Sequence, residues 1–327
     1  MKYIDSHPVA GPRQTAPEVV LIAANIAEID CKEHGKKSES GRVIVSSKHL
    51  PFVNASDKEV WNNSFLPEIY NWLSTVRGQF SATNPSSLKP ATRNTWNRWF
   101  LHLPSKYTDE NGETNDRVDH PAVEAVTKAA LRAYRSDFAK QALKFIEQKM
   151  DEDVPEQTTE GRKVWVAKQL ADMAVLYESP GESKKDHHGL FKSVVVSQTL
   201  AWHLYKTKDS IKYIWFGHPS GSLALAAAVI KRALFIWKDG VKLDIEAEGD
   251  KTNKKKQAAH NSPTSFSQDQ WSDTVEHYYD KYTSKLSEEK YKEIVAYAEK
   301  YMPEKSKKLF QSTQEKFGSE DELIMSD

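Results

Sequence analysis

The stretch HPSGSLALAAAVIKRALFIWKDG, residues 218–240, is the most apolar segment of the chain, and its character decides the fold. A membrane span is excluded because Lys231 and Arg232 interrupt the apolar run after about ten residues, whereas a span needs about twenty. The segment fits a helix, because its larger apolar residues recur at steps of three and four. These residues are Leu223, Ala226, Ala227, Ile230, Leu234 and Trp237.

The two ends of this helix carry recognisable signals. Ser220 or Ser222 is predicted to cap its start, since a serine hydroxyl accepts hydrogen bonds from the free amides of a first turn. Gly240 is predicted to end it in the left-handed conformation, which glycine adopts at little cost. The alanines on the remaining faces allow neighbouring helices to approach closely on several sides. We therefore predict a dry central helix, surrounded by other helices, that holds the molecule together.

The composition of the 327-residue chain indicates an ordered protein without net charge. Lysine plus arginine and aspartate plus glutamate both number 46, so no overall basic field draws the chain onto nucleic acid or anionic lipid. Aromatic residues make up 10%, whereas disordered chains are poor in them. Cys31 is the only cysteine, which excludes an internal disulfide and a cysteine-based zinc site. The N-terminus lacks the apolar run of a secretory signal, so we expect an intracellular protein, in the cytoplasm or nucleus.

Helical periodicity recurs along most of the chain, whereas alternation of strand and helix does not. The sequence therefore predicts an all-α fold: a multi-helix globular bundle around the central apolar helix at about 218–240, with long polar loops. The longest helical pattern follows Asp119-His120-Pro121, and a capping box at Ser56–Glu59 starts an earlier one. Residues 79–90 and 107–117 are predicted to be loops. Helices are predicted at 18–32, 60–78, 91–103, 121–150, 160–178, 189–205, 222–238, 268–286 and 288–302.

Shifts in composition predict three parts. Residues 1–54 are expected to form an N-terminal arm and helix, and residues 55–302 the helical domain. Within this domain, residues 244–265 are charged and lack large apolar side chains after Ile245, so we expect a mobile insert there. Residues 303–327 are expected to form a C-terminal tail.

Familiar catalytic and metal-binding motifs do not emerge from the sequence. Residues 181–186 have the lysines of a phosphate-binding loop but not its second glycine. A nucleophile elbow needs a serine centred between two glycines, and Ser220 lies one residue beyond that position. The adjacent histidines at 187–188 point about 100° apart on a helix and cannot easily share an ion with His203. The acidic residues 151–153 are predicted to lie in a helix-ending loop. We expect no cofactor and no metal, leave the catalytic residues unknown, and favour a protein that is not an enzyme.

Two basic clusters are candidates for nucleic-acid binding. Arg93 and Arg98 are interleaved with Trp96, Trp99 and Phe100, a pattern found where single-stranded bases stack on aromatic rings. The same rings also form a stripe at helical spacing, and we favour a core role for them. The second cluster is a lysine run in a polar loop, where a solvated role is commoner than phosphate contact: Lys251, Lys254, Lys255 and Lys256.

An enzyme of a class outside these motifs would need a pocket between helices. Four residues with polar tips on predicted helices are candidates to line it: Tyr134, Trp202, His203 and Tyr278. A deep apolar cleft there would favour an enzyme, and a solid core would oppose one.

Five segments, taken in order, give the chain a family resemblance: 65–76, 120–143, 190–204, 218–240 and 266–273. Together they resemble an uncharacterised helical domain family of hypothetical proteins from basidiomycete, or mushroom-forming, fungi. The resemblance spans about 55–300 and implies a helical domain of fungal origin, with no established catalytic residue to carry over. Members of that family are sometimes discussed near mobile elements, which implies a connection with nucleic acid or chromatin.

The most specific matches cluster in the apolar segment and just after the charged insert. The chain departs from the family pattern at Ser222, where alanine is expected, and we expect this change to leave the packing unaffected. The matching residues are Pro219, Gly221, Leu223, Ala224, Leu225, Ala226, Arg232, Ala233, Trp237, Gly240, Phe266, Ser267 and Trp271.

Three functions follow as alternatives. The favoured one is an intracellular helical interaction or scaffold protein, with another protein as its partner. The first alternative is a nucleic-acid- or chromatin-associated protein of mobile-element type, and the second is an enzyme with an inter-helical pocket. A membrane partner is not expected, and the sequence does not determine the oligomeric state.

Overall fold

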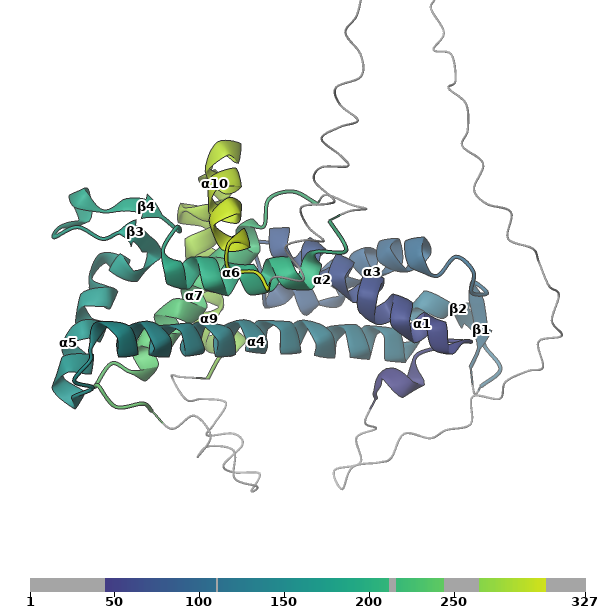
Figure 1. Cartoon of the computed structure of the whole chain (residues 1–327). Coiled ribbons are helices and arrows are strands. Elements are labelled where there is room, and N and C mark those ends of the chain that lie inside the picture. The colour runs from purple at the N-terminus through teal and green to yellow at the C-terminus, as the bar shows by residue number, and fades with distance from the viewer. Residues whose placement is uncertain (1–44, 110, 212–215, 244–264, 304–327) are drawn as a thin grey trace, which may run out of the picture. The chain divides into compact units, whose positions relative to one another are not determined.

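The computed structural model describes residues 45–109, 111–211, 216–243 and 265–303, which form a mostly helical unit (Figure 1). The prediction of a mainly helical fold is confirmed. The predicted helix at 18–32 and nearly all of the charged insert and tail lie outside the described residues. The main helices are α1 (Ala55–Val60), α2 (Leu66–Thr75), α3 (Pro85–Trp99), α4 (Pro121–Asp153), α5 (Thr159–Leu170), α6 (Val194–Thr207), α7 (Ser220–Ile236), α9 (Gln268–Lys281) and α10 (Glu288–Glu299).

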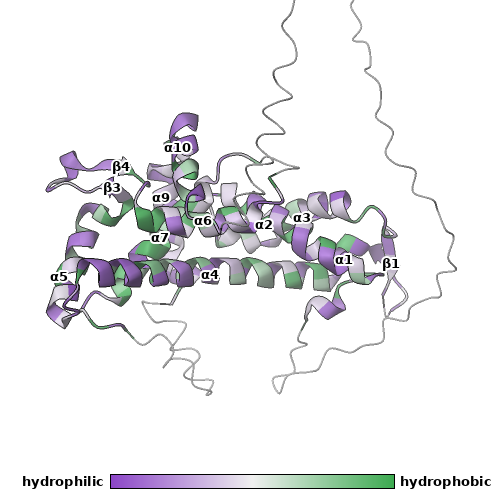
Figure 2. Ribbon diagram, viewed as in Figure 1, coloured by the Kyte–Doolittle hydropathy of each residue, from purple (hydrophilic) through white to green (hydrophobic). Residues whose placement is uncertain are grey.

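Helix α7 is the dry central element that the sequence predicts. The four alanines from Ala224 to Ala228 are fully buried, and the helix contacts α2, α4, α5, α6 and α9. In Figure 2, apolar colour gathers on α7, whereas α4 alternates between hydrophilic and hydrophobic colour along its length. Gly240 has φ +75°, and its amide donates to the Trp237 carbonyl at 2.8 Å, so the predicted left-handed end is confirmed. Each fully buried leucine of this helix contributes about 2 kcal/mol to folding.

The predicted serine cap of α7 is wrong. Pro219 occupies the capping position, and no side chain there accepts a hydrogen bond from the first turn. The Ser220 hydroxyl instead donates to the His218 carbonyl at 3.3 Å. Close packing explains why Gly221 occupies the first turn of α7. A Cβ at this position would lie 2.3 Å from the carbonyl oxygen of Val76, just past the end of α2.

Helix α4 is the longest element, with 33 residues, and confirms the pattern that follows Pro121. His120 caps it, because its Nδ1 accepts a hydrogen bond from the Ala122 amide at 3.1 Å. Figure 1 shows α4 running from the β1–β2 hairpin to α5, and its buried stripe contacts both α6 and α7. This helix therefore supplies the long wall on which the central helices pack.

Two helix starts differ from the prediction. Residues from Pro85 onward are helical rather than loop, since proline is favoured in a first turn, where its missing amide costs nothing. Helix α1 begins at Ala55, before the predicted box, because Asp57 accepts from the amides of Val53 and Asn54 at 3.0 and 2.9 Å. The start of α3 is thus set by a proline in its first turn, and the start of α1 by the Asp57 carboxylate.

Two small antiparallel hairpins were not predicted. Strands β1 (Lys106–Thr108) and β2 (Thr114–Asp116) lie in the segment expected to be a loop, and β3 (Tyr177–Ser179) pairs with β4 (His188–Leu190). In the first hairpin, Asp109 Oδ1 accepts from the amides of Asn111 and Glu113. Three-residue strands are too short to show the period of two by which strands are recognised.

Candidate functional site

A chain of hydrogen bonds crosses the core between α4, α6 and α7. The Tyr134 hydroxyl lies 2.7 Å from Nδ1 of His203 and 3.1 Å from Oγ of Ser222. All three side chains are buried, and the Trp202 ring packs beside Tyr134 at 5.1 Å between centroids. Ser222, where alanine was expected, therefore provides a hydrogen-bond partner for a buried tyrosine.

Burial makes this network a structural one. It lowers the pKa of His203 to about 3, so the imidazole is neutral at physiological pH. It also raises the pKa of the Tyr134 hydroxyl well above its usual value. A neutral, sealed cluster is a poor acid or base for a substrate that would have to open the core to reach it. Tyr134, Trp202 and His203 thus meet in the core, whereas Tyr278, the fourth predicted pocket residue, lies apart on α9.

The two arginines predicted to contact nucleic acid are engaged by carboxylates. Arg93 binds Asp116 at 3.1 Å and Asp119 at 2.5 Å, and Arg98 lies 3.7 Å from Glu68. The neighbouring rings pack inward: Trp96 and Phe100 are buried and lie 4.4 Å apart between centroids, and Trp99 donates to Glu68 at 2.7 Å. The lysines of the second cluster, Lys251, Lys254, Lys255 and Lys256, lie outside the described residues.

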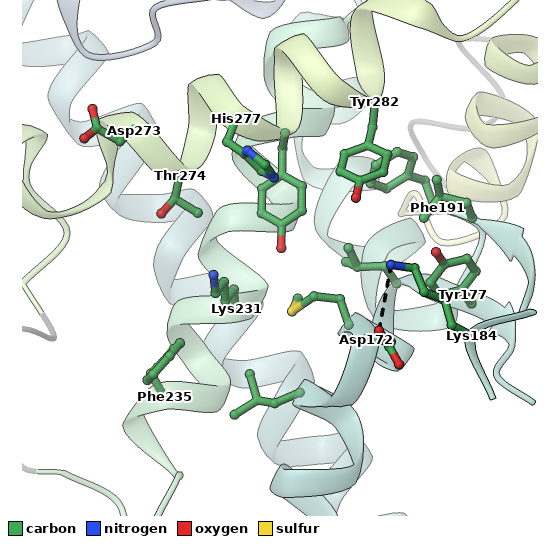
Figure 3. Close-up of a pocket in the computed structure, with 15 residues that line it drawn as sticks. Asp172, Tyr177, Lys184, Phe191, Lys231, Phe235, Asp273, Thr274, His277 and Tyr282 are labelled. Carbon is green, nitrogen blue, oxygen red and sulfur yellow. Dashed lines mark ion pairs between the residues drawn. The ribbon is translucent and has the colours of Figure 1, made fainter. Parts of the chain in front are cut away.

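A hollow of about 620 Å³ is lined by α7, α9, β4 and the helical turn η5 (Ala171–Leu176), and its side chains are drawn in Figure 3. This volume is in the range of sites for small molecules. Charged and polar side chains border its apolar wall, which is made by Leu170, Met173, Leu176, Leu190, Phe191 and Phe235.

The backbone of this wall is held in an unfavourable conformation at three places. Asp172, Met173 and Phe191 have φ of 48°, 55° and 64°, in the left-handed region that side-chain-bearing residues avoid. Each such residue costs about 1–2 kcal/mol. Among the other described residues, Gln157 alone of the non-glycines shares this conformation. Such residues gather where function requires a particular shape, so their clustering marks the hollow as a site.

Three tyrosines line the hollow: Tyr177, Tyr278 and Tyr282. Burial raises the pKa of Tyr278, with smaller contributions from Tyr282 and Tyr177. The Tyr278 ring is largely buried, with the residue only 6% exposed, whereas its hydroxyl oxygen is not among the enclosed polar atoms without a partner in the described parts of the chain and is therefore open to the hollow. A solvent-accessible phenol at an otherwise apolar wall can offer a hydrogen bond to a molecule in the hollow.

Removal of this hydroxyl by Tyr278→Phe is expected to leave the free energy of unfolding unchanged or slightly higher, because no hydrogen bond is lost. Tyr291→Phe is the matched control, since the buried Tyr291 hydroxyl donates to the Thr283 carbonyl at 2.6 Å. The control is expected to lose about 1–2 kcal/mol. Urea unfolding followed by circular dichroism measures both, and equal losses would contradict the assignment of the Tyr278 hydroxyl as open to the hollow.

Two lysines line the hollow, and they differ in whether a carboxylate lies nearby. Lys184 lies 3.8 Å from Asp172, the pair joined by the dashed line in Figure 3. Lys231, half-buried on α7, forms no ion pair with any residue in the described ranges. In the same view the Asp273 carboxylate is directed away from the centre, whereas the His277 ring points toward it. The lining therefore presents one lysine whose ammonium group is not engaged by a carboxylate.

Two further properties of the described residues concern metal ions and membranes. Within the described residues, no group of three or more histidine, cysteine, aspartate or glutamate side chains is arranged to hold a metal ion. Across those same residues, none of the helices combines the length and apolar character needed to cross a membrane.

A family model described as Domain of unknown function (DUF6532) matches residues 89–288, more than half of the chain. The chain belongs to this family. The DUF6532 match lies inside the range of the resemblance noted from the sequence and includes the buried Tyr134 network and every residue that lines the hollow. No curated protein matches the chain, and no solved structure does.

Most of the hollow in this DUF6532 chain was not foreseen from sequence. Of the residues that line the hollow, only Tyr278 is among the predicted pocket residues, and Tyr282 lies on the same predicted helix at 268–286. In the sequence, Lys231 is recognisable only as an interruption of an apolar run, which does not indicate a role in a site. The left-handed backbone at Met173 has no signal in composition, and that at Asp172 has only a weak one, because aspartate adopts a positive φ far less often than glycine does.

Proposed function

We propose that this DUF6532 protein is a helical binding protein rather than an enzyme, and that the hollow beside α7 and α9 is its binding site. The observation that carries the proposal is the hollow itself, which has a volume of about 620 Å³ and a wall of apolar and aromatic side chains that includes Tyr278. The strained backbone at Asp172, Met173 and Phe191 supports it, because its cost is maintained where the shape of the wall matters.

Binding is favoured over catalysis by the way the lining groups are spaced. Among the described lining residues, no histidine, lysine or carboxylate lies within hydrogen-bond distance of a tyrosine or threonine hydroxyl. A nucleophile and its base need such a contact. The core network that does join a serine, a tyrosine and a histidine is sealed from solvent.

The broader biological setting is part of the same proposal. The resemblance of residues 218–240 and 266–273 supports a fungal origin, and the N-terminus without a secretory pattern supports an intracellular protein, for which we propose a role in interaction. Association with nucleic acid is the weaker alternative, because the two described candidate arginines, Arg93 and Arg98, are already near carboxylates.

The proposal is tested by filling the hollow. The neutral apolar dye N-phenylnaphthylamine is expected to bind the full-length protein at one site, and Thr274→Trp, which places an indole in the wall, is expected to weaken binding by about tenfold or more. Phe235→Ala, at a partly exposed position of the same wall, is expected to weaken it several-fold by removing apolar contact.

Gln270→Trp is the matched control for the added indole, since Gln270 is exposed on the same helix and does not line the hollow. It is expected to bind the dye as the wild type does. Circular dichroism and the melting temperature verify that each variant is folded. Dye binding that is the same in Thr274→Trp, Phe235→Ala and wild type would place the binding elsewhere and overturn the proposal.

A further inference from the structure

The lining of the hollow divides into an apolar body and one cationic corner. The apolar part comes from Leu176, Leu190 and Phe191, with the rings of Tyr278 and Tyr282 beside them. The ring centroids of Tyr278 and Tyr282 lie 6.1 Å apart, and those of Phe191 and Tyr282 lie 6.5 Å apart at 82°. Such a wall binds an aromatic or aliphatic body through buried area and ring-edge contacts.

The cationic corner arises from the way α7 separates two adjacent basic residues. Arg232 is buried, and its guanidinium lies 5.9 Å from the centre of the Phe266 ring, so it belongs to the packing between α7 and the segment before α9. Lys231, one step along the helix, faces the hollow instead. The pair that excluded a membrane span therefore has one member in the core and one in the candidate site.

The other charges leave Lys231 as the group that selects the ligand. Lys184 is near Asp172, and the Asp273 carboxylate is directed away from the centre in Figure 3. His277 lines the same side as Lys231 and adds no negative charge. A half-buried lysine with no carboxylate at ion-pair distance within the described residues favours an anionic group in the hollow.

We infer that the hollow takes a small amphipathic acid, with its anionic head against Lys231 and its apolar body on the aromatic wall. The inference rests on the proposed function and specifies the class of ligand for that site. The volume of about 620 Å³ suits a molecule of the size of an aryl carboxylate or a medium-chain fatty acid. The Tyr278 hydroxyl donates to an oxygen of the same ligand.

The test compares two dyes that differ chiefly in charge: neutral N-phenylnaphthylamine and anionic anilinonaphthalene sulfonate. The full chain is expected to bind the sulfonate more tightly than the neutral dye. Lys231→Gln is expected to weaken sulfonate binding about tenfold, as the loss of a charged hydrogen bond does, while neutral-dye binding stays within about twofold. Lys144→Gln, an exposed position on α4, is expected to change neither.

The possible outcomes distinguish failure of the inferred ligand class from failure of the proposed binding site. If Thr274→Trp blocks binding of the neutral dye but Lys231→Gln leaves sulfonate binding unchanged, the inference of an anionic ligand is overturned. The hollow would still be a binding site. Binding of both dyes that is indifferent to Thr274→Trp would overturn both. An equal loss of sulfonate binding in Lys144→Gln and Lys231→Gln would show general surface charge at work and also overturn the role of Lys231.

Discussion

Acidification from pH 7 to pH 4 is expected to lower the free energy of unfolding by about 3 kcal/mol through His203 alone. The pKa of His203 is lowered by burial from 6.5 to about 3 in the folded protein. Between these two values the unfolded chain binds a proton that the folded protein does not. Stability from this group is therefore complete above pH 6.5 and is lost as the pH falls from there toward 3.

The environment of His203 explains why the folded state resists protonation. The side chain is 2% exposed, and its described partner is the neutral Tyr134 hydroxyl at 2.7 Å, which in turn contacts the Ser222 hydroxyl. A buried imidazolium would lack a neighbouring negative charge to offset its loss of hydration. Other groups act in the same direction: burial lowers the pKa of His120, and hydrogen bonds outweigh burial to lower that of Asp57. Hydrogen bonds also lower the pKa values of the surface carboxyls Asp116, Glu178, Asp280 and Glu289.

The measurement is urea unfolding of the wild type and His203→Asn at pH 7, 6, 5 and 4. Asparagine retains a polar atom near the Nδ1 position but does not titrate. The variant is therefore expected to lose stability at neutral pH and to lack the His203 share of the acid loss, about 3 kcal/mol, while the other groups keep theirs. His188→Asn, at an exposed position, is the control and is expected to keep the wild-type slope. A His203→Asn variant that retains the full acid loss would refute the assignment to His203.

Local signals in the sequence were sufficient to predict those features of the fold that depend on the residues of a single helix. Residues 218–240 could be placed in the centre because alanine on every face leaves no surface suited to water, and the burial of α7 follows directly. The start of α4 at Pro121 and the cap of α10 by Ser287 follow from residues within one turn of each helix end.

The candidate site could not be predicted in the same way, because its residues meet only through tertiary packing. Tyr177 and Phe191 come from a hairpin of three-residue strands that periodicity does not detect. Whether Tyr278 faces a hollow or a filled core depends on what lies opposite it on η5 and β4, and the helical stripe is the same in both cases. The polar ends of Tyr134 and His203 make both residues candidates for a pocket, and in the structure these two ends form a hydrogen bond with each other.

Gly240→Ala is expected to lower the free energy of unfolding by about 3 kcal/mol, from two independent causes. The backbone there has φ +75°, and a left-handed residue other than glycine costs about 1–2 kcal/mol. A Cβ at this position would also lie 2.0 Å from the Thr159 carbonyl oxygen, in the first turn of α5, and overpacking adds about 1–3 kcal/mol. The end of the central helix is thus fixed against α5 by the absence of a side chain.

Gly112→Ala separates the two causes. Gly112 has φ +82°, but its added Cβ would have no described heavy atom within 4 Å, so the variant is expected to lose only about 1 kcal/mol from backbone strain. Urea unfolding of both variants at pH 7 gives the difference, which measures the contact between α7 and α5. Equal losses would mean that the turn after α7 can move away from Thr159, and that the central helix is not held at this end by α5.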